Sequence, residues 1–240
     1  MAESPNADII RKMFSSIASG YDLANTVLSA GIHHRWRKDL VAWSEPQLGF
    51  RVLDCATGTG DLAFEFKKAV GVTGQVTATD FCKEMLQVAE QKSKKKSLPL
   101  ILELADATRL QYPDSTFDIA SIGFGIRNVN NIEKALNEMA RVVRPGGKLM
   151  ILEFGQPSIP VIKQAYRFYS EYVLPQIGGV ITGQPSAYKY LQRSSSSFPC
   201  GQDFIDLMKK TLRFETCEYR SLSGGIAYLY RGVVAPRLYN

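Results

Sequence analysis

The chain has 240 residues, of which 45% are hydrophobic and 22% are charged. These values are ordinary for a folded globular protein, argue against disorder, and allow one α/β domain with a sizeable core. The formal net charge of +6 is compatible with an anionic membrane surface or with nucleic acid, but it demonstrates neither partner.

Cysteine and histidine usage argues against metal sites and disulfides. Four cysteines are scattered without C-x-x-C spacing and only two histidines are present, so we expect no metal site and reduced thiols in a cytoplasm. The first eight residues are polar and lack the apolar part of a signal peptide. No apolar run approaches the about 18 residues that a spanning helix needs. Any membrane contact is therefore predicted to be peripheral.

Helices are predicted over the first 50 residues. Ser4 and Pro5 suit a helix start, and apolar residues then recur on one face over 9–17. Asp22 is predicted to cap a second helix that Gly31 ends, and a third helix stops before Pro46.

The next segment predicts a ligand site. An apolar run ends at Asp54 and is followed by Gly58, Thr59 and Gly60, which is typical of a buried strand that leads into a glycine turn and a helix over 61–70. Glycines let the backbone approach a ligand, and free N–H groups at the helix start can donate to it. Asp54 would lie at the carboxyl edge of the sheet, where ligands of open α/β sheets bind.

Strands and helices then alternate, as in a parallel α/β sheet. Strands are predicted at 76–80, 100–105, 117–124 and 148–154, and helices at 84–93 and 131–143, the second ended by Pro145-Gly146-Gly147. Lysines at 92 and 94–96 are expected at a solvated helix end rather than in a nucleic-acid patch. A late helix ends within 208–213, and segments 215–222 and 226–234 predict an antiparallel hairpin.

Residues 156–201 are rich in Pro, Gly, Ser and aromatic residues and are too long for a plain connection, so they predict a helical lid or substrate element. We therefore expect a single domain over 1–240. Its parts are a helical extension (1–50), a ligand-binding core (51–155), the lid (156–201), and a C-terminal helix with the hairpin (202–240).

The glycine turn alone leaves two enzyme classes open. Residues 58–63 also fit the dinucleotide fingerprint G-x-G-x-x-G/A, and Asp80 follows about 20 residues later, as that motif expects. Both classes would use Asp80 on a ribose. Against a dinucleotide enzyme, no tyrosine is followed by lysine four residues later, so the usual short-chain dehydrogenase couple is missing.

Four motifs, in order along nearly the whole chain, resemble the ubiquinone/menaquinone biosynthesis C-methyltransferase family. They are Tyr21-Asp22-Leu23-Ala24-Asn25 with His33-x-x-Trp36, Asp54 to Leu62, Phe124-Gly125-Ile126-Arg127-Asn128-Val129, and Arg141 to Phe154. Four ordered motifs are far more specific than the glycine fingerprint alone. The resemblance implies an α/β, Rossmann-like class I methyltransferase that uses S-adenosyl-L-methionine, with a mostly parallel sheet and an antiparallel C-terminal hairpin.

The resemblance also assigns cofactor contacts to positions of this chain. It implies that Gly58, Thr59 and Gly60 line the methionine end, that Asp80 accepts the ribose hydroxyls, that Asp106 and Ala107 contact the adenine, and that Asp54 acts on the methionine ammonium through backbone or water. The structural alternatives are a helix-cap role for Asp80 and a surface turn for Asp106.

The implied reaction is C-methylation of a polyprenyl hydroquinone, most directly the demethylmenaquinone methyltransferase reaction that converts demethylmenaquinol to menaquinol. The benzoquinol of ubiquinone biosynthesis, or both rings, is the alternative, and an NAD-dependent oxidoreductase is a distant one. An ionised ring hydroxyl would make the adjacent carbon nucleophilic. The candidates are Arg127 for phenolate stabilisation or water-mediated deprotonation, His33 as general base, and Tyr21 to orient the ring. Their structural alternatives are a carboxylate pair, a helix cap and a core position.

A polyprenyl tail requires that the substrate come from a membrane. Aromatic residues over 166–172, with Lys163 and Arg167, suit docking to an anionic surface, although core packing of these aromatics is the alternative. We therefore expect a cytoplasmic enzyme that contacts the inner face of the membrane peripherally and has no nucleic-acid partner. The sequence leaves the oligomeric state open, a homodimer included.

Overall fold

The computed structural model of the protein describes residues 6–236, and three helices precede its sheet. They are α1 (Ala7–Ile17), α2 (Tyr21–Leu28) and α3 (Ile32–Ser44). Asn6 caps α1, because its side chain accepts hydrogen bonds from the backbone N–H groups of Asp8 and Ile9. The predicted start at Ser4 and Pro5 lies outside the described residues.

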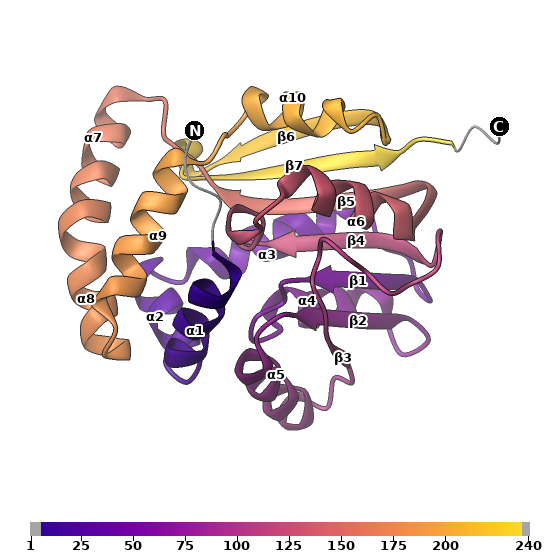
Figure 1. Ribbon diagram of the computed structural model, residues 1–240, viewed down its shortest axis with the longest axis horizontal. Helices are drawn as coiled ribbons and strands as arrows, with labels where there is room; N and C mark the ends of the chain where they lie inside the picture. Colours follow the sequence, from indigo (N-terminus) through magenta and orange to yellow (C-terminus); the bar gives the residue numbers. More distant parts are fainter. Residues whose placement is uncertain (1–5, 237–240) are drawn as a thin grey trace.

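Seven strands form one twisted sheet in the order β3-β2-β1-β4-β5-β7-β6 (Figure 1). Their bounds are β1 (Arg51–Cys55), β2 (Gln75–Asp80), β3 (Ile101–Leu104), β4 (Phe117–Gly123), β5 (Val143–Phe154), β6 (Phe214–Leu222) and β7 (Ala227–Val234). Strands β1 to β5 pair in parallel, whereas β7 pairs antiparallel with both β5 and β6. The predicted fold class is confirmed, including the C-terminal hairpin.

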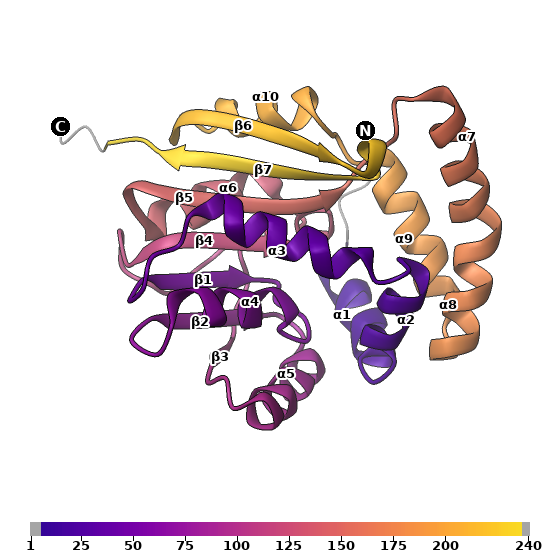
Figure 2. The ribbon, with the colours of Figure 1, turned by 180° about the vertical axis from the view of Figure 1, so that it is seen from behind.

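Helices cover both faces of the sheet, because successive strand residues point to opposite sides. On β1, Val52 packs in the core shared with α3 and α4 (Asp61–Val70), which lie in front in Figure 2. Its neighbour Leu53 packs in the core shared with α6 (Ile132–Val142) and α10 (Gln202–Lys210), which lie in front in Figure 1. The helix α5 (Lys83–Lys96) packs against β2 and β3.

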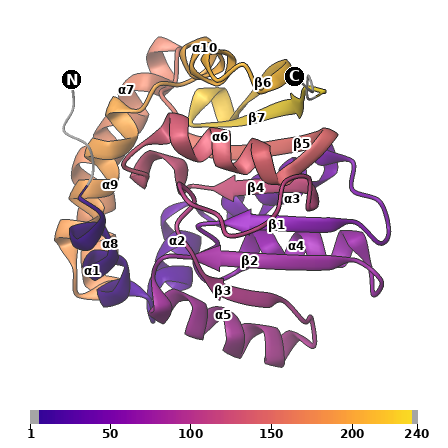
Figure 3. The same cartoon turned by 45° about the vertical axis from the view of Figure 1, so that its right-hand side comes forward.

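A layer of helices lies beyond the carboxyl ends of the parallel strands (Figure 3). It consists of α1, α2, α7 (Pro160–Phe168), a π-helical turn η2 (Tyr169–Val173), α8 (Leu174–Thr182) and α9 (Pro185–Ser197). Residues 160–182 and 185–197 are thus helical, and their expected role as a lid or substrate element stays a prediction. The layer has its own core, in which Ile17, Ala24, Leu174 and Tyr188 are buried together. No helix among the described residues is long and apolar enough to cross a membrane.

Two expected boundaries in the helical extension are wrong. Asp22 does not cap α2, since Gly20 precedes the helix and Asp22 lies in its first turn. The helix ends at Leu28 rather than at Gly31. Gly31 nevertheless closes the turn, with a φ of 76° and an N–H that donates to the carbonyl of Thr26.

One boundary near the end of the sheet also differs. Helix α6 ends at Val142 and β5 begins at Val143, so Pro145-Gly146-Gly147 lies inside the strand, where the pairing with β4 shifts register. A Cβ at Gly147 would lie 2.6 Å from the carbonyl oxygen of Asp118, which explains the glycine. The late helix α10 ends at Lys210, within the predicted range 208–213.

Candidate active site

Two adjoining cavities lie between the carboxyl edge of the sheet and the helical layer. The first, which we call the polar cleft because Asp80 and Asp106 line it, has a volume of about 780 Å³. The second, which we call the apolar cavity, is lined mostly from the helical layer and has a volume of about 1020 Å³. Phe14, Tyr21 and Phe124 line both. The two cavities therefore meet at these three side chains, and ligands in them could touch.

Asp80 anchors the polar cleft at the end of β2. Its Oδ2 accepts a hydrogen bond of 2.8 Å from the N–H of Gly58, and its Oδ1 accepts one of 2.9 Å from the N–H of Cys82. Burial raises the pKa of this carboxyl to about 6, although the bonds to the backbone act in the opposite direction. Each carboxylate oxygen has a second lone pair, so Asp80 can still accept ligand hydroxyls.

Asp106 and Ala107 line the same cleft from the segment after β3. The backbone N–H and the hydroxyl of Thr108 both donate to Asp106 Oδ1, at 2.8 and 2.9 Å, which fixes the carboxylate. The turn that we named as the alternative for Asp106 is therefore present, and Asp106 still lines the cleft. The cleft thus offers a nucleoside-like ligand two carboxylates, Asp80 and Asp106, and the glycine backbone at Gly58.

Three predicted cofactor residues do not line the polar cleft. Thr59 is buried, and its hydroxyl donates to Asp22 Oδ1 at 2.5 Å. Gly60 is the N-cap residue that precedes α4, with a φ of 85°. Asp54 accepts hydrogen bonds of 2.6 Å from the hydroxyls of Thr57 and Ser121, and burial raises its pKa to about 6. These residues support the glycine loop without lining the cleft. The indirect role that we expected of Asp54 stays a prediction.

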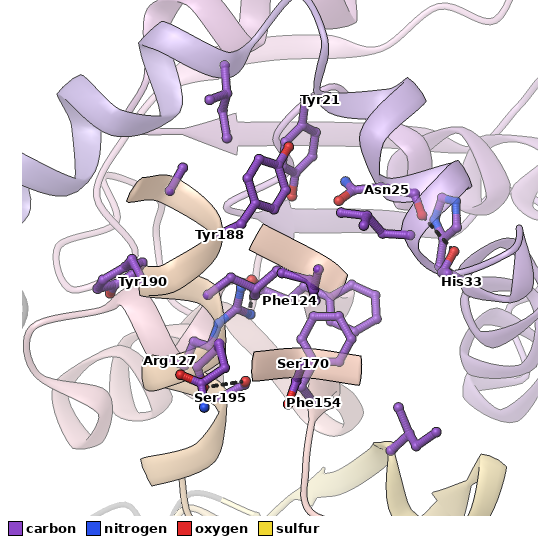
Figure 4. Close-up of a pocket in the computed structure, with 18 of the residues that line it drawn as sticks. Tyr21, Asn25, His33, Phe124, Arg127, Phe154, Ser170, Tyr188, Tyr190 and Ser195 are labelled. Carbon is purple, nitrogen blue, oxygen red and sulfur yellow. Dashed lines mark hydrogen bonds between the residues drawn. The ribbon is translucent and has the colours of Figure 1, made fainter. Parts of the chain in front are cut away.

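The apolar cavity is walled mostly by aromatic and aliphatic side chains from the helical layer (Figure 4). Tyr21, His33 and Arg127, the three predicted catalytic residues, all line it. Burial raises the pKa of the Tyr21 phenol, so it stays protonated near neutral pH and can donate a hydrogen bond.

Arg127 lies on the short 3₁₀ turn η1 (Ile126–Asn128) and pairs with a buried carboxylate, Glu153. Its guanidinium donates to Glu153 Oε1 and to the carbonyl of Phe124, both at 2.6 Å. The structural alternative for Arg127 is therefore realised. Even so, its buried Nε has no hydrogen-bond partner within the described part of the chain. This Nε has almost no accessible surface, but Nη2 takes part in neither of the two bonds above, so the Arg127 guanidinium keeps a donor for a ligand oxygen in the cavity that it lines.

His33 is engaged on both ring nitrogens. Its Nδ1 accepts from the guanidinium of Arg37, and its Nε2 lies 3.4 Å from the hydroxyl of Thr26. Burial, with the charge of Arg37 second, lowers the pKa of His33 to about 3. Because a neutral imidazole has one lone pair and Arg37 occupies it, this arrangement disfavours the general-base role.

His33 also belongs to a cluster whose ligand atoms would suit a cation. The atoms of His33, His34 and Asp61 lie within 4.8 Å of one another. The guanidinium of Arg37, however, bonds to His33 and lies 3.6 Å from Asp61 Oδ2. This positive charge already occupies the position that a metal ion would need.

The aromatic segment divides between two environments. The elements α7, η2 and α8 follow one another without a break, and we call them the helical rod. Tyr166 and Tyr169 line the apolar cavity, whereas Phe168 and Tyr172 are more than half exposed on the outer face of this rod. Core packing therefore accounts for one pair and surface exposure for the other. Helical periodicity could have separated the pairs, since they alternate along 166–172.

The sequence reasoning missed several residues that organise the site. Glu153 pairs with Arg127, and Lys92 pairs with Asp22 and Asp61, each pair brought together from distant parts of the chain. Lys92 therefore lies in a partly buried ion pair, and the expectation that it would be solvated at a helix end is wrong. The signal for Glu153 was present, because it is the only charged residue in an otherwise apolar run over 149–154. No pattern pointed to Lys92.

Comparisons with known proteins agree with this geometry. The model of the ubiE/COQ5 methyltransferase family matches residues 2–234. The ubiquinone/menaquinone biosynthesis C-methyltransferase UbiE of Bdellovibrio bacteriovorus is 60% identical over 96% of this chain and 98% of its own. The protein of the same name from Psychromonas ingrahamii is 42% identical over 96% of this chain and 92% of its own. The chain belongs to the ubiE/COQ5 methyltransferase family.

Solved structures agree on the fold. A S-adenosylmethionine-dependent methyltransferase of Thermotoga maritima superposes with a TM-score of 0.66 at 20% identity, over 92% of this chain and 98% of that one. Phosphoethanolamine N-methyltransferase 2 of Haemonchus contortus, in complex with S-adenosyl-L-methionine, gives 0.61 at 15% identity, over 84% and 53%. For this ubiE/COQ5 family member, the predicted family, fold and cofactor are confirmed, and the dinucleotide alternative is not retained.

We predict that His33 stays neutral between pH 5 and 8, because burial and Arg37 lower its pKa to about 3. Imidazole ¹H–¹⁵N correlation spectra should give one Nε2–H tautomer throughout. Since the unfolded chain takes up this proton near pH 6.5, the contribution of His33 to stability is present above pH 6.5 and is lost as the pH falls toward 3. The chain unfolded in urea is the control. A His33 resonance that titrates near 6.5 in the folded protein would contradict the geometry.

Proposed function

We propose that this protein transfers a methyl group from S-adenosyl-L-methionine to a ring carbon of a polyprenyl hydroquinone, converting demethylmenaquinol to menaquinol. The observation that carries the proposal is the junction of the polar cleft with the apolar cavity at Phe14, Tyr21 and Phe124. Two ligands held on either side of this junction would be close enough to react, which is the main requirement of a transfer between them.

The polar cleft fits the cofactor through its own residues. Asp80 would accept the ribose hydroxyls, Asp106 the adenine amino group, and the backbone of Ala107 would donate to the ring. Gly58 has a φ of 57°, a left-handed conformation that favours glycine at this turn. When bound, the cofactor supplies an electrophilic methyl group on a sulfonium.

The apolar cavity fits an aromatic ring with hydroxyl groups. Its aromatic walls exclude water, while the Tyr21 hydroxyl and the Arg127 guanidinium donate to ring oxygens and so stabilise the phenolate. Glu153 holds the guanidinium in place through its 2.6 Å bond. We assign ring orientation to Tyr21 and phenolate stabilisation to Arg127, and we withdraw His33 as general base. As the ring C–C bond forms, the sulfonium C–S bond would break to leave S-adenosylhomocysteine, and the ring proton that the methyl group replaces would be released to solvent.

The outer face of the helical rod fits contact with a membrane that holds the polyprenyl tail. Val161, Phe168, Tyr172 and Val180 expose between 58% and 87% of their surface, and the inner face of the rod lines the apolar cavity. A tail leaving the cavity would therefore meet this face. We propose peripheral docking here, at the inner face of the membrane, for an otherwise cytoplasmic enzyme.

The benzoquinol of ubiquinone biosynthesis is the second candidate substrate, because the printed names of the relatives include both quinones. The test is turnover of methyl-labelled S-adenosylmethionine with reduced demethylmenaquinol and, in parallel, with the demethylated benzoquinol. Label on the naphthoquinol alone supports the menaquinone role, and label on both makes the enzyme dual. Label on the benzoquinol alone would contradict the proposed substrate, and label on neither would overturn the proposed reaction.

We predict that the double variant Arg127→Met/Glu153→Gln lowers kcat by about 10²- to 10³-fold with unchanged affinity for S-adenosylhomocysteine, because it removes the donor to the phenolate. Changing both partners avoids the cost of a lone buried carboxylate, about 3–5 kcal/mol, which the single variant Arg127→Ala should incur. Enzyme assays and calorimetry measure the two effects. The exposed Arg35→Met is the control, and full turnover in the double variant would refute the role of Arg127.

We predict that affinity for S-adenosylhomocysteine falls as the pH drops through about 6, toward tenfold per pH unit, because ribose hydroxyls prefer the ionised form of Asp80 and its pKa is raised to about 6. Asp80→Asn should bind weakly at every pH and lack the part of this dependence that Asp80 causes. Calorimetric titration between pH 5 and 8 measures both proteins. Equal wild-type affinity at pH 5 and pH 7 would count against the assignment.

We predict that Phe168→Ser/Val180→Ser lowers binding to vesicles of phosphatidylcholine and phosphatidylglycerol by at least about tenfold, because each exposed apolar side chain contributes roughly 1.5–3 kcal/mol when buried. Changing Lys163 and Arg167 to glutamine should weaken binding to the anionic vesicles selectively. Co-sedimentation measures both effects. Val72→Ser, in the turn after α4 at 96% exposure, is the matched control. Unchanged binding in the double variant would exclude this face.

A further inference from the structure

A cluster of charges behind the glycine loop joins parts of the chain that are far apart in sequence. Lys92 Nζ on α5 donates to Asp22 Oδ2 on α2 at 2.6 Å, to Asp61 Oδ1 on α4 at 2.5 Å, and to the Thr59 hydroxyl at 3.1 Å. Arg37 on α3 lies 3.6 Å from the other oxygen of Asp61. We call Asp22, Arg37, Thr59, Asp61 and Lys92 the loop cluster.

The loop cluster is partly buried and balanced in charge. The side chains of Lys92 and Asp61 are 18% and 20% exposed. Burial alone would raise the pKa of Asp61, but the charges of Arg37 and Lys92 outweigh it and hold this pKa below its ordinary value. Two cations thus face two carboxylates, and Lys92 is the cation that touches both. Without Lys92, Asp22 and Asp61 would repel each other across Thr59.

The loop cluster connects the walls of both cavities. Asp22 follows Tyr21, which lines both cavities, and precedes Asn25, which lines the apolar one. Thr59 follows Gly58, which lines the polar cleft. The bond between Thr59 and Asp22 therefore ties α2, which forms part of the wall of the apolar cavity, to the loop that forms the floor of the polar cleft.

From this arrangement we infer that Lys92 is a positioning residue that couples the two cavities, so that binding in the polar cleft and binding in the apolar cavity strengthen each other. A ligand that orders the glycine loop fixes Thr59, which holds Asp22 and keeps Tyr21 over the apolar cavity. By linkage, a ring that orders Tyr21 and α2 stabilises the same loop. The inference rests on the proposed function for the identity of the two ligands.

Calorimetry with two unreactive probes tests the inference. Affinity for S-adenosylhomocysteine is measured with and without a saturating naphthoquinol that carries one isoprene unit, under reducing conditions. We expect the naphthoquinol to tighten wild-type binding by about fivefold or more. In Lys92→Met this factor should fall below about twofold, while each probe alone still binds. Lys94→Met, an equal loss of charge on the exposed side of α5, should keep the wild-type factor.

A second variant keeps the test decisive if Lys92→Met does not fold. Asp22→Asn retains an oxygen for the Thr59 hydroxyl and removes the ion pair with Lys92, so it should also reduce the coupling factor. Wild-type coupling in both variants would overturn the inference, as would wild-type binding of both probes without coupling. Failure of the wild type to bind S-adenosylhomocysteine at all would instead contradict the proposed function, and the inference would fall with it.

Discussion

The candidate site depends on one contact across the ends of β1 and β2, the hydrogen bond from the Gly58 amide to the Asp80 carboxylate. This bond holds the glycine loop against the sheet and fixes a buried carboxylate at the carboxyl edge. The remaining bond to the N–H of Cys82 fixes the same carboxylate at the start of α5. Asp80 therefore ties one point of the glycine loop to the sheet and to the start of α5.

The helical layer supplies what the sheet alone lacks. An open parallel sheet exposes its carboxyl edge, and α1, α2, α3 and residues 160–197 help to turn this edge into two cavities. The ion pair between Arg127 and Glu153 is central to the electrostatics of the site, because both side chains are buried. Such a pair contributes little net stability by itself, yet it holds a cationic donor in an apolar wall. A functional role therefore explains this buried ion pair better than a contribution to stability does.

Periodicity and turn chemistry predicted the order and type of nearly every sheet-forming element, because hydrophobic alternation and glycine turns are local properties of the chain. The spacing after the glycine turn indicated Asp80 as a ligand contact, whereas the family resemblance indicated Asp106 and Arg127, and all three line cavities. The direction of the Thr59 side chain was not predictable, since its partner Asp22 is contributed by a separate helix. Lys92 was misjudged for the same reason. Its partners lie 31 and 70 residues away, and charge runs carry no information on such contacts. Pro145-Gly146-Gly147 mimicked a helix stop, although a strand can also absorb it as a bulge.

The central claim is that the two cavities hold the methyl donor and the hydroquinone and meet at Tyr21. A crystal structure with S-adenosylhomocysteine and a short-tailed naphthoquinone tests it most directly. We expect the ribose against Asp80, the adenine beside Asp106, a ring oxygen at the Arg127 guanidinium, and the sulfur facing a ring carbon past Tyr21. A ring bound outside the apolar cavity, or an adenosyl group away from Asp80, would contradict it.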